Sequence, residues 1–265
     1  MSIARKILSP LALTSLVLAS LAACASGGSP GGGHGARGGR AVESQPLPSI
    51  GDPGKVAATD IAFARAARDE GQWTAFAEYA GIGALLHGDN GVMEAGPWLG
   101  GRADPAQAVR WVPRAVFASC DGTLAASEGR FVEPDGTVGS YVTVWQPDSR
   151  GDYKWIYAVG GPDDPQPPAS VTQDIPQGDA VIVVEAINAI EGKVADCMEG
   201  SVQLTPVSAA PPDGAVAGGG GTSRDGTLRW QWEQRANGTR RFHVTYRRDG
   251  DWQVPVDFTA SPVDD

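Results

Sequence analysis

Apolar residues recur at three- and four-residue spacings between residues 55 and 80, which predicts two short helices. Gly71 separates the two segments, since glycine commonly ends a helix. The stripe of the first helix is formed by Val56, Phe63, Ala64 and Ala67. That of the second is formed by Trp73, Phe76, Ala77 and Ala80. The apolar run from Ile82 to His87 then ends near the tight-turn pair Asn90-Gly91, so a strand and a hairpin are expected.

The apolar period next changes to two, the period of half-buried strands. Three such segments span 122–133, 138–146 and 153–160, and clusters of Pro, Asp and Gly separate them, which predicts an antiparallel meander. Before the meander, Asp104-Pro105 has the N-cap and first-turn residues of a helix that would reach Trp111. Helices followed by a sheet predict the α+β fold class.

The C-terminal part of the chain is also rich in strand patterns. Pro162 to Gln177 predicts an extended proline-rich connector, and the β-branched run from Val181 to Val184 predicts a buried strand. The glycine-rich stretch from Pro211 to Ser223 predicts a loop. Three further alternating segments follow at 228–233, 241–246 and 252–258, each with one apolar and one polar face.

A short sequence echo links the two strand regions. Asp121-Gly122-Thr123-Leu124 recurs as Asp225-Gly226-Thr227-Leu228, and a strand, a Gly-Thr turn and an aromatic strand follow each copy. Either the sheet is duplicated or both stretches obey the same hairpin rules, and chance similarity is the simpler interpretation. The second copy has no helices of its own, so its apolar face is expected to cover the first domain or a small sheet containing residues 180–190.

The N-terminus has the pattern of a secretory signal peptide, with Arg5 and Lys6 before an uncharged apolar stretch from Ile7 to Ala23. The stretch ends in Leu21-Ala22-Ala23-Cys24, which resembles the lipobox of bacterial lipoproteins. This resemblance implies cleavage before Cys24, acylation of that cysteine, and delivery of the anchored protein to the periplasmic side of the outer membrane. An ordinary signal peptide is the alternative.

Composition and charge restrict the partners of the mature chain. Hydrophobic residues make up 42% and charged residues 20%, values typical of a globular protein. The formal net charge of −10 argues against nucleic acid as a partner. The glycine- and proline-rich residues 24–54 contain almost no core-forming side chains and predict a tether.

Two cysteines remain once Cys24 is acylated. Cys120 and Cys197 are expected to form a disulfide in an oxidising compartment, and two separately buried thiols are the alternative. No metal site is expected, because they lack the clustered spacing of zinc ligands. The sequence contains no nucleophile elbow, phosphate loop or other motif that would require a cofactor.

Residues 55–161 resemble the DUF4440-type branch of the NTF2-like superfamily. The resemblance rests on Asp60 to Ala64, Gly71 to Tyr79, Gly139 to Trp145 and a closing strand with Trp155. It implies a cone in which a curved antiparallel sheet wraps around N-terminal helices, with an additional C-terminal antiparallel β region outside it. The expected domains are a signal peptide at 1–23, a tether at 24–54, the NTF2-like domain at 55–161, a connector at 162–178 and a β-rich extension at 179–265 packed on that domain.

The resemblance also implies a cavity inside the cone, although none of the motifs carries chemistry. His87 and Tyr79 are the acid–base candidates at its rim, and an exposed His87 beside a turn is the alternative. The aromatic residues expected to contact a ligand are Trp73, Phe76, Trp98, Trp111 and Tyr141. Trp98 is expected in a loop.

Three functions remain open from the sequence. The leading hypothesis is a lipid-anchored envelope protein whose cavity binds a small apolar ligand or a protein partner without catalysis. An isomerase- or cyclase-type enzyme that uses His87 and Tyr79 is the second hypothesis. A structural interaction module that presents its C-terminal sheet is the third.

Overall fold

The computed structural model describes residues 50–167, 189–197 and 214–261. Cys24, the expected tether as far as residue 49, and the strand expected at Val181 to Val184 lie outside the described residues. The α+β class is confirmed, because three helices accompany a large, mainly antiparallel sheet in the described part of the chain.

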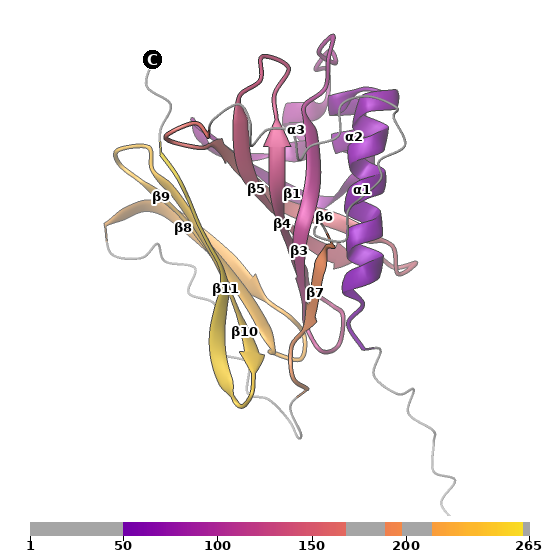
Figure 1. The fold of residues 1–265 in the computed structure, drawn as a ribbon, viewed down its shortest axis with the longest axis vertical. Coiled ribbons are helices and arrows are strands. Elements are labelled where there is room, and N and C mark those ends of the chain that lie inside the picture. Colours follow the sequence, from indigo (N-terminus) through magenta and orange to yellow (C-terminus); the bar gives the residue numbers. More distant parts are fainter. Residues whose placement is uncertain (1–49, 168–188, 198–213, 262–265) are drawn as a thin grey trace, which may run out of the picture. The chain divides into compact units, whose positions relative to one another are not determined.

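The two predicted N-terminal helices are present as α1 (Pro53–Asp69) and α2 (Gln72–Tyr79) (Figure 1). Asp52 begins α1, since its carboxylate accepts a hydrogen bond from the backbone amide of Lys55 at 3.0 Å. Gly71 joins the helices with a φ of 121°, a value that side chains with a Cβ rarely adopt. A third helix, α3 (Ala95–Leu99), contains Trp98 where a loop was expected.

The helix expected from Asp104 to Trp111 is absent, and Asp104 caps α2 instead. Its carboxylate accepts hydrogen bonds from the backbone amides of Trp73 (2.5 Å) and Thr74 (3.1 Å). Gly71, at the N-cap of α2, has no side chain that could do this. The prediction that Asp104 begins a helix is therefore wrong, because its carboxylate caps a helix about 30 residues earlier in the chain.

The larger sheet has the strand order β2-β1-β6-β5-β4-β3-β7. The predicted hairpin is present, with Gly88 opposite Gly91, and the predicted meander forms the antiparallel strands β4 to β6. Parallel pairs of β1 with β6 and of β3 with β7 complete the sheet. Its strands are β1 (Ala80–Gly88), β2 (Gly91–Glu94), β3 (Arg110–Ala118), β4 (Ala125–Val132), β5 (Val138–Pro147), β6 (Tyr153–Pro162) and β7 (Glu191–Val194).

A bulge in β6 changes which face of the sheet its residues cover. Val144 pairs with Tyr157 and Trp145 with Trp155, so Ile156 is an extra residue on β6. Trp155 consequently packs in the helix-side core, whereas Tyr157 packs in the core on the other face of the sheet. The bulge thus supplies aromatic side chains to both cores.

The smaller sheet has the order β11-β10-β9-β8, and its apolar face packs on the larger sheet. Trp230, Phe242 and Val244 share one buried core with Tyr157 and Val142. Strands β9 to β11 therefore pack against the larger sheet. The strands are β8 (Ala215–Thr222), β9 (Leu228–Arg235), β10 (Arg240–Arg248) and β11 (Asp251–Ala260).

The prediction of a loop at Pro211 to Ser223 is wrong for the residues of β8. Gly219 lies opposite Trp232, and Gly221 lies opposite Trp230. A Cβ at either glycine would come within 2.8 Å of the indole nitrogen of the facing tryptophan. The glycines therefore form a strand that accommodates two large rings, rather than a flexible linker.

The two copies of the sequence echo form reciprocal hydrogen bonds with each other. The backbone amide of Asp121 donates to the Asp225 carboxylate at 2.9 Å, and the amide of Asp225 donates to the Asp121 carboxylate at 3.1 Å. Each aspartate also accepts from the threonine two residues later. Each turn precedes a meander of three antiparallel strands, so the equivalence extends from sequence to hydrogen bonding and favours duplication over coincidence.

A disulfide joins Cys120 to Cys197, with a distance of 5.1 Å between the Cα atoms. Cys120 directly precedes Asp121, one of the two aspartates that form the reciprocal hydrogen bonds. Cys197 follows β7, the strand that pairs with β3 at the edge of the larger sheet. The larger sheet therefore includes a strand from the segment that was expected to belong only to the C-terminal extension.

Candidate functional site

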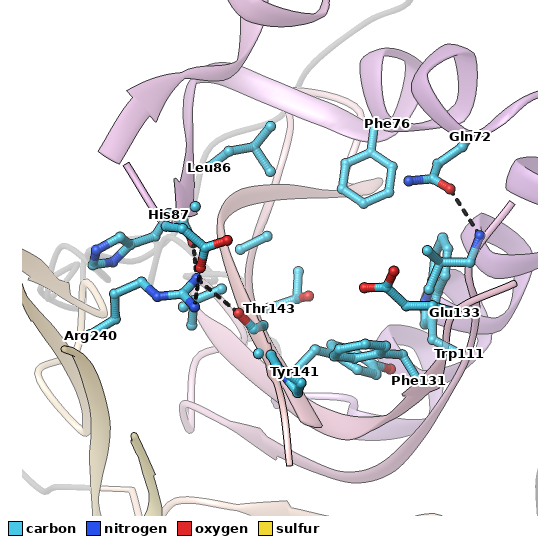
Figure 2. A pocket seen from close by; sticks show the side chains of 18 of the residues that line it. Gln72, Phe76, Leu86, His87, Trp111, Phe131, Glu133, Tyr141, Thr143 and Arg240 are labelled. Carbon is cyan, nitrogen blue, oxygen red and sulfur yellow. Dashed lines mark hydrogen bonds and ion pairs between the residues drawn. The ribbon is translucent and has the colours of Figure 1, made fainter. Parts of the chain in front are cut away.

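A cavity of about 550 Å³ lies on the helix-facing side of the larger sheet. Helices α1 to α3 and strand β3 supply one end of its wall, and β1, β6 and Arg240 of β10 supply the other. Figure 2 shows Phe76 and Leu86 on one side of the cavity, with Phe131 and Tyr141 on the opposite side. This volume is within the range of pockets that bind small organic molecules.

The wall is mainly apolar and aromatic, and the five aromatic residues expected to contact a ligand all contribute to it. These residues are Trp73, Phe76, Trp98, Trp111 and Tyr141. The four other than Tyr141 form edge-to-face contacts with one another or with Phe63, with ring centroids of Phe63 and Trp111 4.8 Å apart and those of Trp73 and Trp98 5.0 Å apart. Arg102 stacks over Trp98 with its guanidinium carbon 3.6 Å from the ring centroid.

A buried carboxylate fixes part of this wall. Asp60 of α1 accepts hydrogen bonds from the Trp111 indole (2.9 Å), the Ser127 hydroxyl (2.7 Å) and the Tyr141 hydroxyl (3.1 Å). Ser127 in turn accepts from the indole nitrogen of Trp145 at 2.9 Å. The network ties α1 to β3, β4 and β5, so it positions two cavity-lining aromatic rings.

Burial dominates the acid–base properties of this network. Loss of hydration raises the pKa of Asp60 from 3.8 to about 6, although the three hydrogen bonds from Ser127, Trp111 and Tyr141 each lower it. The pKa of Tyr141 is raised well above 10 by its own burial and by the Asp60 charge. Asp60 is fully buried, and both of its oxygens are occupied by protein donors.

His87 is buried rather than exposed beside a turn, and although it is one of the residues that line the cavity, its ring packs against Trp232 of the second sheet. The side chain is buried, and strand alternation places Leu86 on the cavity side and His87 on the side of the second sheet. Its Nε2 is 2.6 Å from the amide oxygen of Gln234, and its Nδ1 is 2.6 Å from the Tyr157 hydroxyl. Because an amide oxygen only accepts, Nε2 carries the proton and Nδ1 accepts from Tyr157 in the neutral ring.

The environment of His87 favours this neutral form. Burial lowers its pKa, and the Arg240 charge lowers it further, whereas the bond to Gln234 raises it. His87 belongs to the cavity wall, as expected, but both of its ring nitrogens already have protein partners. It ties β1 to β6 and β9, and no carboxylate contacts its ring among the hydrogen bonds of the described residues.

Tyr79 also differs from its expected position. Its ring stacks on Phe63 with centroids 5.0 Å apart, and Lys154 Nζ lies 5.5 Å from its centroid. It is not one of the residues that line the cavity. Partial burial and the charges of Glu78 and Glu70 raise its pKa above 10, which makes the phenol a poor proton donor at neutral pH.

Sequence reasoning did not single out the polar residues of the wall as candidates. Arg240 and Glu133 line the cavity, and Asp60 supports it from behind. A signal was present in two cases: Asp60 lies four residues after Val56 on the apolar stripe of the first helix, and Arg240 lies on the same strand face as Phe242 and Val244. A charged residue is unusual at a position where the apolar period predicts burial, and it indicates a structural or binding role for that side chain.

Comparison with known proteins finds no family model that matches this chain and no curated protein that is significantly similar to it. In the part of the chain that the structure describes, no three metal-ligating side chains gather into a cluster. Within the same residues, no helix is long and apolar enough to cross a membrane.

Proposed function

We propose that this protein is a lipid-anchored protein of the bacterial envelope whose NTF2-like cavity binds a small apolar ligand without chemical conversion. The observation that carries the proposal is the aromatic wall: seven aromatic side chains surround one cavity of ligand size. They are Phe63, Trp73, Phe76, Trp98, Trp111, Phe131 and Tyr141. Burying a ligand against such rings stabilises the complex by removing apolar surface from water.

The positions of His87, Tyr79 and Asp60 support binding over catalysis, although the carboxylates of Asp89 and Glu133 also line the cavity. A general acid or base must reach the reacting atom directly or through one water. Both ring nitrogens of His87, a residue of the cavity wall, are occupied by Tyr157 and Gln234, and Tyr79 lies against Phe63. Asp60 has a pKa near neutrality, but protein donors enclose its carboxylate completely. A ligand as small as the cavity also fits this site better than a folded protein partner does.

Filling the cavity should abolish ligand binding. Thr143 of β5 lines the cavity, and the variant Thr143→Trp would place an indole in the ligand volume. For the neutral fluorescent probe N-phenyl-1-naphthylamine and the purified full chain, we expect affinity to fall by about tenfold or more, because the probe loses most of its apolar contact area.

The matched control is Thr245→Trp, since Thr245 lies on the face of β10 that points away from the core formed by Val244 and Tyr246. This variant should bind the probe like the wild type, and urea unfolding would verify that both variants are folded. Equal probe affinity in folded Thr143→Trp and wild-type protein would refute binding in this cavity.

The proposed anchor depends on Cys24. In a bacterial host supplied with an alkyne-labelled fatty acid, the wild-type chain should incorporate the label and Cys24→Ser should not, because the acylated sulfur is missing. The control Cys197→Ser removes a different cysteine and should be labelled normally. Labelling that persists in Cys24→Ser would contradict lipid anchoring.

A further inference from the structure

Arg240 brings a buried positive charge to one end of the cavity. It belongs to β10 of the smaller sheet, its side chain is only 3% exposed, and it lines the cavity wall. Its Nη1 donates to the backbone carbonyl oxygens of His87 (3.2 Å) and Gly160 (3.0 Å). Figure 2 shows the guanidinium reaching into the cavity beside these groups. The carbonyls hold the guanidinium in place but do not neutralise it.

The remaining edge of the guanidinium is incompletely satisfied. Nη2 is 2.7 Å from Asp89 Oδ1, yet neither Nη2 nor Nε makes a well-directed hydrogen bond with the described residues. Asp89 lies in the turn between β1 and β2, and its side chain is 56% exposed. The buried cation therefore has a counter-ion that can move into water, whereas Arg240 itself cannot follow.

The free edge has the geometry that a carboxylate recognises. Nε and Nη2 present two parallel N–H bonds, which match the two oxygens of a carboxylate in a bidentate pair. Gly160 and Gly161 of β6 line this end of the cavity and place no side chain beside Arg240. Nε and Nη2 themselves are buried, so a ligand carboxylate reaches this edge only when Asp89 moves away from it. A Cβ at Gly161 would already lie 3.5 Å from Nη2.

Other charges at the cavity restrict both the charge and the orientation of a ligand. Glu133 lies across the cavity from Arg240 in Figure 2, and partial burial together with the charges of Asp135 and Asp89 raises its pKa. A negative group of the ligand is repelled from Glu133 and attracted to Arg240. One arginine near two carboxylates suits a single negative charge rather than a dianion such as phosphate.

We propose that the cavity binds an amphipathic monocarboxylate, whose apolar body lies among the aromatic rings and whose carboxylate replaces Asp89 on the Nε–Nη2 edge of Arg240. This inference rests on the proposed ligand-binding function and adds the chemical class of the ligand. The aromatic end of the cavity receives the hydrocarbon, because Trp73, Phe76 and Trp111 gather there.

The test compares one hydrocarbon with and without a charge. The fluorescent probes are cis-parinaric acid and its methyl ester, titrated into the purified full chain. The wild type should bind the acid about tenfold more tightly than the ester, since a charge-assisted bidentate contact is worth more than a neutral one. Arg240→Gln should reduce the affinity for the acid to that for the ester and leave the ester unchanged.

Two further variants keep the test decisive if Arg240→Gln does not fold. Asp89→Asn alters an exposed turn residue and removes the competing carboxylate, so it should tighten binding of the acid several-fold and not that of the ester. Arg241→Gln is the matched control, because Arg241 is the next residue on the exposed strand face and should affect neither probe.

The outcomes separate this inference from the proposed function. Equal affinity of the wild type for acid and ester, with binding lost in Thr143→Trp, would overturn the monocarboxylate and leave apolar binding intact. An Asp89→Asn variant that binds the acid no more tightly than the wild type would also overturn it. Absence of binding for acid, ester and neutral probe alike would refute both proposals.

Discussion

Replacing Cys120 and Cys197 together by serine is expected to lower the free energy of unfolding by about 4 kcal/mol, the loss that chain-entropy estimates assign to a cross-link of this loop length. The disulfide closes a loop with a sequence separation of 77 residues. Without it, the unfolded chain gains conformational freedom. The short strand β7, which lies inside this loop just before Cys197, also loses its covalent attachment beside β3.

Urea unfolding of the oxidised wild type and the double serine variant measures this difference. The wild type reduced with dithiothreitol provides a control that has the same side chains but no cross-link, and it should unfold like the double variant. A double variant as stable as the oxidised wild type would show that the disulfide does not contribute to stability. Ligand affinity should change little while the protein is folded, because neither cysteine lines the cavity.

Asp60 should make the protein less stable at neutral pH than at pH 4, by about 2 kcal/mol for this group alone. Folding raises its pKa from 3.8 to about 6, so the folded state binds a proton more tightly than the unfolded state. The stabilising contribution of the protonated form is complete below pH 3.8 and is lost as the pH rises through 6. Above that pH, the folded protein must hold a buried negative charge.

The variant Asp60→Asn isolates this effect from other titrating groups. Asparagine is close to isosteric, its amide oxygen can still accept from Trp111, and its amide nitrogen can donate to the hydroxyl of Ser127 or Tyr141. Relative to the wild type, we expect the variant to gain about 2 kcal/mol in unfolding free energy between pH 4 and pH 7.

Chemical unfolding of both proteins at matched pH values measures the difference. Asp104 and Asp135 have lowered pKa values and impose the opposite pH dependence, but they are present in both proteins and cancel in the comparison. A stability difference that stays constant from pH 4 to pH 7 would contradict the raised pKa of Asp60.

The candidate site could be predicted from the sequence only for its apolar part. Aromatic side chains such as Trp111 and Tyr141 are costly to expose to water, so these residues together with the family resemblance predicted an aromatic cavity wall. Successive side chains of a strand point to opposite faces of the sheet, so a register shift of one residue would reverse the direction of the His87 ring. The sequence alone does not fix that register. The role of Arg240 depends on how the second sheet packs on the first, and no local sequence pattern predicts that packing.

Local patterns in the sequence determined the helices α1 and α2, the Asn90-Gly91 hairpin and the strands β4 to β6, because helix period and turn residues act within a few positions. Only the tertiary structure decided where the long-range partners lie. Asp104 caps α2 across 30 residues, and the glycines of β8 pair with tryptophans in β9 rather than forming a loop. Asp104 satisfies amide groups of a distant helix, and that helix lies beside it only in the folded chain. The glycines leave room for tryptophan rings that come opposite them only when the strands pair.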